Sequence, residues 1–227
     1  MSGFELVCAG RVAGPPPSAQ RLVALLALQE RPVQRVYIAG KLWPDSSEER
    51  ALASLRSAIW RANRPGHLVV STRDSRVALA PGVRIDVREA LVQAQALIDG
   101  SAPDELGFAD FLLTGELLPD WYDDWLVIER ERVRQLRLHA LEALTARLVE
   151  RARYGEATEA ALWAIACEPL RESAHRALIR VHLAEANPSE AVRHYELFRD
   201  MLRTNLGLKP SRQLTALVEP LLPVTVR

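Results

Sequence analysis

Cysteine is scarce in this chain, and long apolar runs are missing. The two cysteines, Cys8 and Cys167, lie far apart and outside any CxxC motif. This pattern is typical of buried thiols in a reducing compartment rather than of a disulfide or a metal site. No stretch approaches the roughly 18 to 20 uncharged residues that a membrane span needs, and no signal peptide pattern follows Met1. These absences predict a cytoplasmic chain with no membrane partner.

Motifs of common enzymes are lacking as well. The sequence contains no GxxxxGK(S/T), GxGxxG, HExxH or GxSxG pattern, so it offers no phosphate-binding loop, zinc peptidase helix or nucleophile elbow. Its histidines are scattered, and no cysteine or carboxylate is spaced to complete a metal site with them. Surface or interface positions are therefore expected for His139, His175 and His182. We expect a protein that is not an enzyme and that uses no cofactor and no metal.

Charge is balanced overall but unevenly divided along the chain. Residues 1–98 carry 13 Lys and Arg against 8 Asp and Glu, whereas residues 99–227 carry 16 against 21. The hydrophobic share of 48% in 227 residues indicates a globular chain with room for two ordinary domains. The asymmetry suggests a basic module that meets a polyanion, joined to an acidic module that does not.

The first part of the sequence has the order of elements of a winged helix. A strand is expected over 4–10, and the prolines at 15–17 are expected to exclude regular structure directly after it. Ser18 is the expected N-cap of a helix to Gln29, followed by helices over 35–42 and 46–63. Two β-rich runs, 68–72 and 77–79, form a hairpin. The pattern predicts a winged-helix DNA-binding domain over residues 1–86.

The remainder, residues 87–227, is expected to be all helical. Helices are predicted over 87–98 and from about 120 to 153, with Asp120, Asp123 and Asp124 as acids of the first turn of the longer one. A shift of 34 residues superposes Leu144 on Leu178 and Ala164 on Phe198. Thirty-four residues is the tetratricopeptide period. The predicted fold class is therefore mainly α: a winged helix followed by a tetratricopeptide-like helical repeat domain.

The helix expected over 46–63 carries a face with arginines and serines and no acid. At about 100° per residue, its buried stripe is predicted to consist of Leu52, Leu55, Ile59 and Ala62. The opposite face holds Arg50, Ser54, Ser57, Arg61 and Arg64, and its flank holds Arg56, Trp60 and Asn63. An α-helix fits the major groove, where arginine can bind guanine with two hydrogen bonds and serine can bind phosphate.

A solvated face is the alternative, because arginine is a good helix former and exposed faces are usually charged. Ordinary faces mix both signs, however, and between positions 50 and 76 six arginines stand against one acid, Asp74. Such a stretch repels itself unless a polyanion neutralises it, which favours DNA. Arg73 and Arg76 at the hairpin tip either reach the DNA backbone or minor groove or are simply solvated. Trp60 is expected to pack at the edge of the core, with a sugar–phosphate contact as the alternative.

The sequence resembles the SARP-type (AfsR-like) transcriptional activators, which have an OmpR-like winged helix followed by a bacterial transcriptional activation domain. The resemblance covers nearly the whole chain. It is carried by residues 20–28, Leu42-Trp43-Pro44-Asp45, residues 55–61, the run 118–141 around Trp121-Tyr122-Asp123-Asp124-Trp125, and Leu206-Gly207-Leu208-Lys209-Pro210.

The resemblance implies that residues 48–64 are the recognition helix, that the protein binds directly repeated promoter sites in double-stranded DNA as pairs, as a homodimer would, and that it activates transcription by recruiting RNA polymerase. One departure is that Asn63 stands where the family usually has a basic residue, so affinity or site preference is expected to differ. The alternative function is a helical-repeat interaction scaffold whose winged helix no longer binds DNA, suggested by the modest excess of positive charge in residues 1–98.

Overall fold

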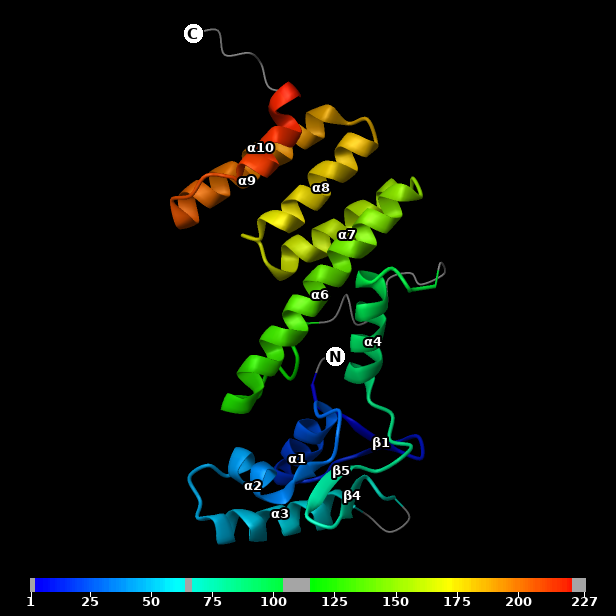
Figure 1. The fold of residues 1–227 in the computed structure, drawn as a ribbon, viewed down its shortest axis with the longest axis vertical. Coiled ribbons are helices and arrows are strands. Elements are labelled where there is room, and N and C mark those ends of the chain that lie inside the picture. Colours follow the sequence, from blue (N-terminus) through cyan, green and yellow to red (C-terminus); the bar gives the residue numbers. More distant parts are fainter. Residues whose placement is uncertain (1–2, 64–66, 104–114, 222–227) are drawn as a thin grey trace. The chain divides into compact units, whose positions relative to one another are not determined.

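A computed structural model describes residues 3–63, 67–103 and 115–221, and the chain in it is mainly helical (Figure 1). It divides into two compact units. The first unit consists of Met1–Leu91 and Thr114–Arg132, and the second of Val92–Leu113 and Val133–Arg227. Helices α4 (Asp86–Ile98) and α6 (Asp124–Glu150) each contribute residues to both units. The expected domain boundary at residue 86 stays a prediction.

The first unit begins with a β-hairpin and three helices. Strands β1 (Leu6–Cys8) and β2 (Arg11–Ala13) pair antiparallel. The two-residue turn between them, Ala9-Gly10, has positive φ at both positions, as the tight turns favoured by β-hairpins require. Helices α1 (Pro17–Ala27), α2 (Arg35–Leu42) and α3 (Glu48–Ala62) follow, and each packs against the other two.

The start of α1 corrects the expectation drawn from the prolines. Instead of excluding structure, Pro16 is the N-cap of α1 and Pro17 is its first residue. A proline fits there because its fixed φ is helical and its missing N–H would have had no partner in the first turn. The amide of Gln20 donates to the carbonyl of Pro15 at 2.8 Å, which adds a further contact at this end.

A three-stranded antiparallel sheet completes the winged helix. Strands β4 (Val70–Arg73) and β5 (Arg76–Leu79) form the expected hairpin, and β3 (Val33–Gln34) pairs with β5, which gives the order β3-β5-β4. Strand β3 has only two residues, too few for an alternation of apolar and polar residues to show it in the sequence. The core of this unit contains Leu22, Leu26, Ile38, Leu42 and Leu55, all at most 1% exposed.

Arginine side chains attach the flanking segments to the first unit. Arg88 donates to the carbonyls of Ala27 at 2.8 Å and Leu26 at 3.0 Å, which lie in the last turn of α1, where carbonyls have no partner within the helix. Arg130 donates to the carbonyls of Leu117 at 2.8 Å and Trp121 at 2.6 Å. Both guanidinium groups therefore satisfy buried backbone acceptors within this unit.

Helix α6 begins at Asp124, so the expected start near residue 120 is wrong. Of the three acids, only Asp124 lies in the first turn. Asp123 instead accepts a hydrogen bond from the Nε of Arg21 at 2.6 Å, which holds the segment before α6 against α1. Trp121 stacks on Phe4 with 5.9 Å between ring centroids, which also holds this segment. The contact with Arg21 explains why Asp123 is not used in the helix.

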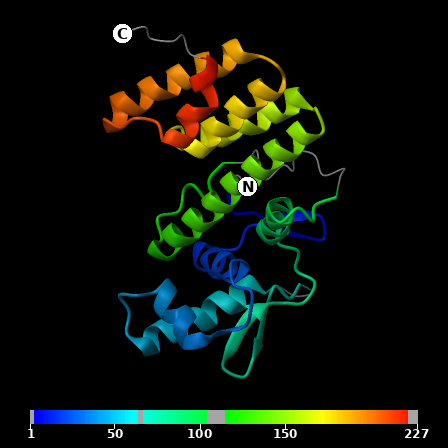
Figure 2. The same cartoon turned by 45° about the horizontal axis from the view of Figure 1, so that its top comes forward.

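The second unit is a row of antiparallel helices. Helices α7 (Tyr154–Cys167), α8 (Glu172–Ala184) and α9 (Pro188–Leu206) lie side by side in sequence order, and α10 (Arg212–Val218) packs on α8 and α9 before a short 3-10 helix, Glu219–Leu221 (Figures 1 and 2). The two pairs that the 34-residue shift was found to superpose, Leu144 with Leu178 and Ala164 with Phe198, are buried in both copies.

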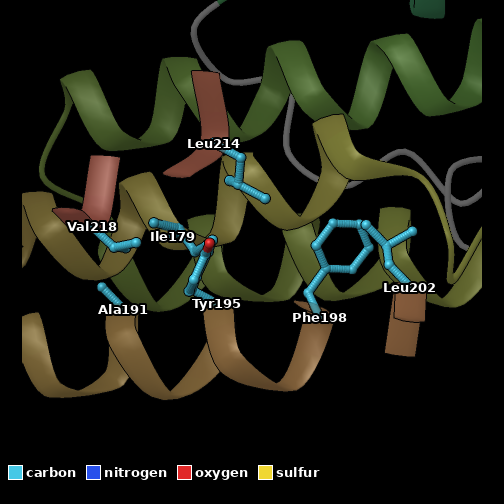
Figure 3. Packing of buried hydrophobic residues seen from close by; sticks show 7 residues of the cluster. All are labelled: Ile179, Ala191, Tyr195, Phe198, Leu202, Leu214 and Val218. Atoms are coloured by element: carbon cyan, nitrogen blue, oxygen red, sulfur yellow. The ribbon is translucent and has the colours of Figure 1, made fainter. Parts of the chain in front are cut away.

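Aromatic residues fill the last repeat. Tyr195 and Phe198 of α9 pack with residues of α8 and α10, as Figure 3 shows for the cluster of Ile179, Ala191, Tyr195, Phe198, Leu202, Leu214 and Val218. The hydroxyls of Tyr195 and Thr215 lie 3.1 Å apart, within hydrogen-bond distance. Because α10 covers this cluster, it acts as the terminal cap that a helical repeat array requires. Within the described ranges, no helix has the length and apolar character to span a bilayer.

Candidate nucleic-acid interface

Helix α3 packs into the first unit through small residues. Its buried positions are Ala51, Leu55, Ala58 and Ala62, at intervals of three and four residues. The predicted stripe was therefore partly wrong, since Leu52 and Ile59 are only half-buried. The prediction counted large apolar residues and therefore misplaced the stripe. Three of the four buried residues are alanines, whose small side chains let α3 approach its neighbours closely.

This rotation changes which residues stand at the centre of the outer face. Arg56 and Trp60 lie opposite the buried stripe, and both are exposed. The exposed fraction of Trp60 is 77%, so the expectation that it packs at the edge of the core is wrong. Arg50, Ser57 and Arg61 are also exposed, and Ser54 is half-buried at the side. Arg64, the remaining predicted residue of this face, lies outside the described residues.

The arginines of this face are not neutralised by the protein. Within the described ranges, no hydrogen bond or ion pair engages the side chains of Arg50, Arg56 and Arg61. Arg84 in the same unit, in contrast, forms a two-point pair with Glu89, with both N–O distances 3.0 Å. The outer face of α3 thus presents positive charge and an exposed indole to whatever approaches it.

The β4–β5 hairpin, which follows α3 in the chain, carries two further arginines. Arg73 and Arg76 pair across the end of the hairpin, are exposed, and have no side-chain partner among the described residues. Asp74 in the turn has a φ of 55°, and the backbone N–H of Arg35 donates to Ser75 at 2.9 Å. That bond ties the tip of the hairpin to the start of α2. The whole hairpin, β4 with β5, is here called the wing.

Asn63 connects the end of α3 with the wing. Its side-chain Nδ2 donates to the carbonyl of Val70 at 2.9 Å, and its Oδ1 accepts from the N–H groups of Val69 at 2.9 Å and Val70 at 2.8 Å. Sequence reasoning treated Asn63 only as a lost basic residue. Asparagine at a helix end is a general capping signal, but nothing in the sequence names a strand as its partner.

The histidines provide no second site. His175 is fully buried, so its expected surface or interface position is wrong. Its Nδ1 lies 3.0 Å from the Nε2 of His194, its Nε2 lies 2.8 Å from the carbonyl oxygen of Pro169, and its ring stacks on Phe198. Burial lowers the pKa of His175, and burial together with His175 lowers the pKa of His194 to about 4. The pair is therefore neutral at pH 7. In the part of the chain that the structure describes, no group of His, Cys, Asp or Glu could hold a metal ion.

The fold joins a winged helix to a helical repeat. A profile of the bacterial transcriptional activator domain matches residues 72–222. The chain belongs to this family of transcriptional regulators, and the resemblance to SARP-type activators is confirmed. The match begins within β4, so α3 lies before it.

The solved structure "Mycobacterium tuberculosis EmbR in complex with low affinity phosphopeptide" is similar over 98% of this chain, with a TM-score of 0.70 and 19% sequence identity. The match spans 64% of the EmbR chain. The likeness shows the fold, and it confirms the predicted fold class of winged helix and helical repeat. Among proteins of curated function, no match was found.

Proposed function

We propose that this chain is a sequence-specific DNA-binding transcriptional activator that reads promoter DNA with the outer face of α3. One observation carries the proposal: the exposed face of α3 displays Arg50, Arg56 and Arg61 around Trp60, and no described acid pairs with them. A charged face without internal partners gains most from a polyanion, because phosphate supplies the counter-charge that the protein does not.

The proposed division of labour follows from the chemistry of each side chain. Arg56 and Arg61 can bind O6 and N7 of guanine in the major groove, while Arg50 and the hydroxyls of Ser54 and Ser57 contact phosphates. The indole of Trp60 has a single N–H donor, so it cannot form two hydrogen bonds with the edge of a base. Its exposed indole is suited to the thymine methyl group or to the sugar edge.

The wing adds a second contact beside the recognition helix. Arg73 and Arg76 extend from the end of a hairpin that is tied to both α2 and α3. In the proposed complex they meet the backbone or the narrow minor groove next to the bases that α3 reads. Arg64 is part of the same proposal from the sequence alone.

The second unit supplies protein contacts in this proposal. Trp163 on α7 and Leu197 on α9 are 40% and 49% exposed and stand 34 residues apart, so they occupy equivalent positions of successive repeats, on two helices with α8 between them. Exposed apolar residues in a row are typical of protein interaction surfaces. We assign the second unit to contact with RNA polymerase and with a second copy of the chain on a directly repeated promoter site.

The experiment that tests the proposal is unbiased selection of bound DNA by the purified full-length protein, followed by affinity measurements on the selected site. Arg61→Ala is expected to weaken binding by about five- to a hundredfold and to relax the preference at one position. Arg84→Ala is the matched control, because Arg84 is exposed in the same unit but paired with Glu89. It should bind like the wild type. Binding without any site preference would contradict the proposal.

A second candidate function is an interaction scaffold with a winged helix that does not bind DNA. The small positive excess of residues 1–98 favours it, because most domains that bind DNA carry a strong basic patch. A stable protein complex that forms equally well with Arg61→Ala, together with failed DNA selection, would favour the scaffold. The free arginines of α3 are the reason that we place DNA binding first.

A further inference from the structure

The side chain of Asn63 forms a three-bond link between the recognition helix and the wing. Asn63 is the C-cap of α3, and its backbone N–H still donates to Ile59 at 3.1 Å, so the residue is held by the helix. Its side chain binds Val69 and Val70 through one donated and two accepted hydrogen bonds of 2.8 to 2.9 Å. The side-chain amide therefore forms hydrogen bonds with the backbone of Val69 and Val70, as the backbone of a neighbouring strand would.

The groups that Asn63 satisfies are buried and lie where the chain enters an edge strand. In the order β3-β5-β4, strand β4 has a neighbour on one side only. Val69 and Val70 are 4% and 1% exposed, so water cannot readily replace the amide. The carbonyl of Val69 accepts from the N–H of Ala80 at 2.8 Å. Loss of Asn63 would leave buried backbone donors and an acceptor without partners, which is costly.

This link lies between the two charged surfaces of the proposed interface. Arg61 stands two residues before Asn63 on α3, and Arg73 stands three residues after Val70 on β4. Both arginines are exposed, and neither is held by a side-chain partner among the described residues. Their separation is therefore set by the backbone, and the bonds of Asn63 fix the backbone at the junction.

We propose that Asn63 is a positioning residue that holds the wing against α3, so that Arg61 and Arg73 engage the same stretch of DNA. The inference rests on the proposed function. It gives Asn63 a role opposite to the one that its place in the sequence suggests, because the asparagine raises affinity through geometry rather than lowering it through a missing charge. An extended binding surface gains affinity from such preorganisation, since less order has to be imposed on binding.

The substitution Asn63→Arg separates the two interpretations. If Asn63 is merely a lost phosphate contact, the added charge strengthens binding and makes it more dependent on salt. If Asn63 is the link, the arginine breaks three hydrogen bonds, and binding weakens despite the added charge. We expect affinity to fall by roughly tenfold at constant ionic strength. An increase in affinity would overturn the proposal.

A double-mutant cycle tests positioning more sharply than affinity alone. Asn63→Asp is the mild variant, because it keeps the acceptor for both N–H groups and places a second acceptor against the carbonyl of Val70. The pair Arg73→Ala with Arg76→Ala is expected to weaken binding about tenfold in the wild-type background and less than about twofold with Asn63→Asp, because the wing is then already out of place. Equal losses in both backgrounds would overturn the role, since a purely structural residue lowers stability without such coupling.

Amide hydrogen exchange keeps the two proposals distinguishable. In the unbound wild type, the N–H groups of Val69 and Val70 are expected to exchange slowly, and Asn63→Asp should raise their exchange at least about tenfold more than that of Val77 in β5. Fast exchange in the wild type would overturn the link even if DNA binding holds. If the wild type selects no DNA site, the proposed function fails and the positioning role with it, whereas slow exchange would still show the link itself.

Discussion

The second unit and the outer face of α3 with the wing use arginine in different ways. In the second unit, arginines pair with acids: Arg171 donates to Glu142 at 2.8 Å, and Arg153 donates to Glu156 at 2.7 Å. On the outer face of α3 and on the wing, the arginines are exposed, and no acid pairs with them among the described residues. Elsewhere in the first unit arginines also pair, as Arg21 does with Asp123 and Arg84 with Glu89, so the unpaired arginines are specific to α3 and the wing. Free charge in a defined place, rather than total charge, is what indicates an external partner.

The largest effect is expected from removing that free charge. The triple variant Arg50→Ala, Arg56→Ala and Arg61→Ala should lose roughly a hundredfold or more in DNA affinity, because three contacts to bases or phosphates disappear. Its thermal unfolding should match that of the wild type, since no described bond is lost. A control triple, Arg84→Ala, Arg153→Ala and Arg193→Ala, removes the same charge from paired positions and should keep its affinity. Equal affinity losses in the two triples would break the comparison.

A large effect on stability is expected from the aromatic core of the second unit. Phe198 is fully buried, so Phe198→Ala should lower the free energy of unfolding by about 3 to 5 kcal/mol. The loss combines the transfer of the ring to water with the cavity left behind. Urea titration followed by circular dichroism measures it. Leu197→Ala is the control, because Leu197 is the neighbouring residue on α9 and is 49% exposed. Similar losses for both variants would mean that the cluster of Figure 3 does not stabilise this unit.

A smaller effect is expected from one arginine of the second unit. Arg171→Ala removes the partner of Glu142, and both side chains are about one-fifth exposed. We expect a loss of about 1 to 2 kcal/mol, since Ser173 still donates to Glu142 at 2.6 Å. In the same urea titration, Arg61→Ala should change stability by less than about 0.5 kcal/mol. If Arg61→Ala proved the more destabilising, the arginine of α3 would be a structural residue.

At neutral pH the smallest effect is expected from His194, because its contribution appears only as an acid sensitivity of the second unit. The pKa of His194 is lowered to about 4, mainly by burial, from 6.5 for a free histidine. The unfolded chain therefore binds the proton more readily, so stability is fully present above pH 6.5 and is lost as the pH falls towards 4. His194→Gln should flatten this part of the curve of unfolding free energy against pH. A wild-type curve that is already flat between pH 6.5 and 4 would contradict the lowered pKa.

The fold was largely predictable from the sequence because its signals are local or periodic. The helices of the first unit follow apolar repeats of three and four residues, and the 34-residue shift finds positions that are buried in both repeats. The strand β3 and the start of α6 were not predictable, since they depend on pairing with β5 and on contacts to Arg21 and Phe4. Such long-range contacts leave no trace in a local pattern.

The candidate interface was predictable in composition but not in orientation. The six arginines between positions 50 and 76 are plain in the sequence. Their arrangement was not, because Ala51 and Ala58, rather than Leu52 and Ile59, form the buried line of α3. That difference moved Trp60 from its expected place at the edge of the core to the centre of the exposed face. Asn63 was misread for a related reason: its partner is a backbone six to seven residues away, which no composition rule identifies.

The most direct test of DNA binding by the free arginines is the salt dependence of affinity on a selected DNA site. We predict that the logarithm of the binding constant falls linearly with the logarithm of salt concentration, and that Arg73→Ala makes the slope shallower by about one. Arg84→Ala, whose charge is already paired with Glu89, should leave the slope unchanged. Binding that does not weaken as salt rises, or a slope that neither variant changes, would contradict the account.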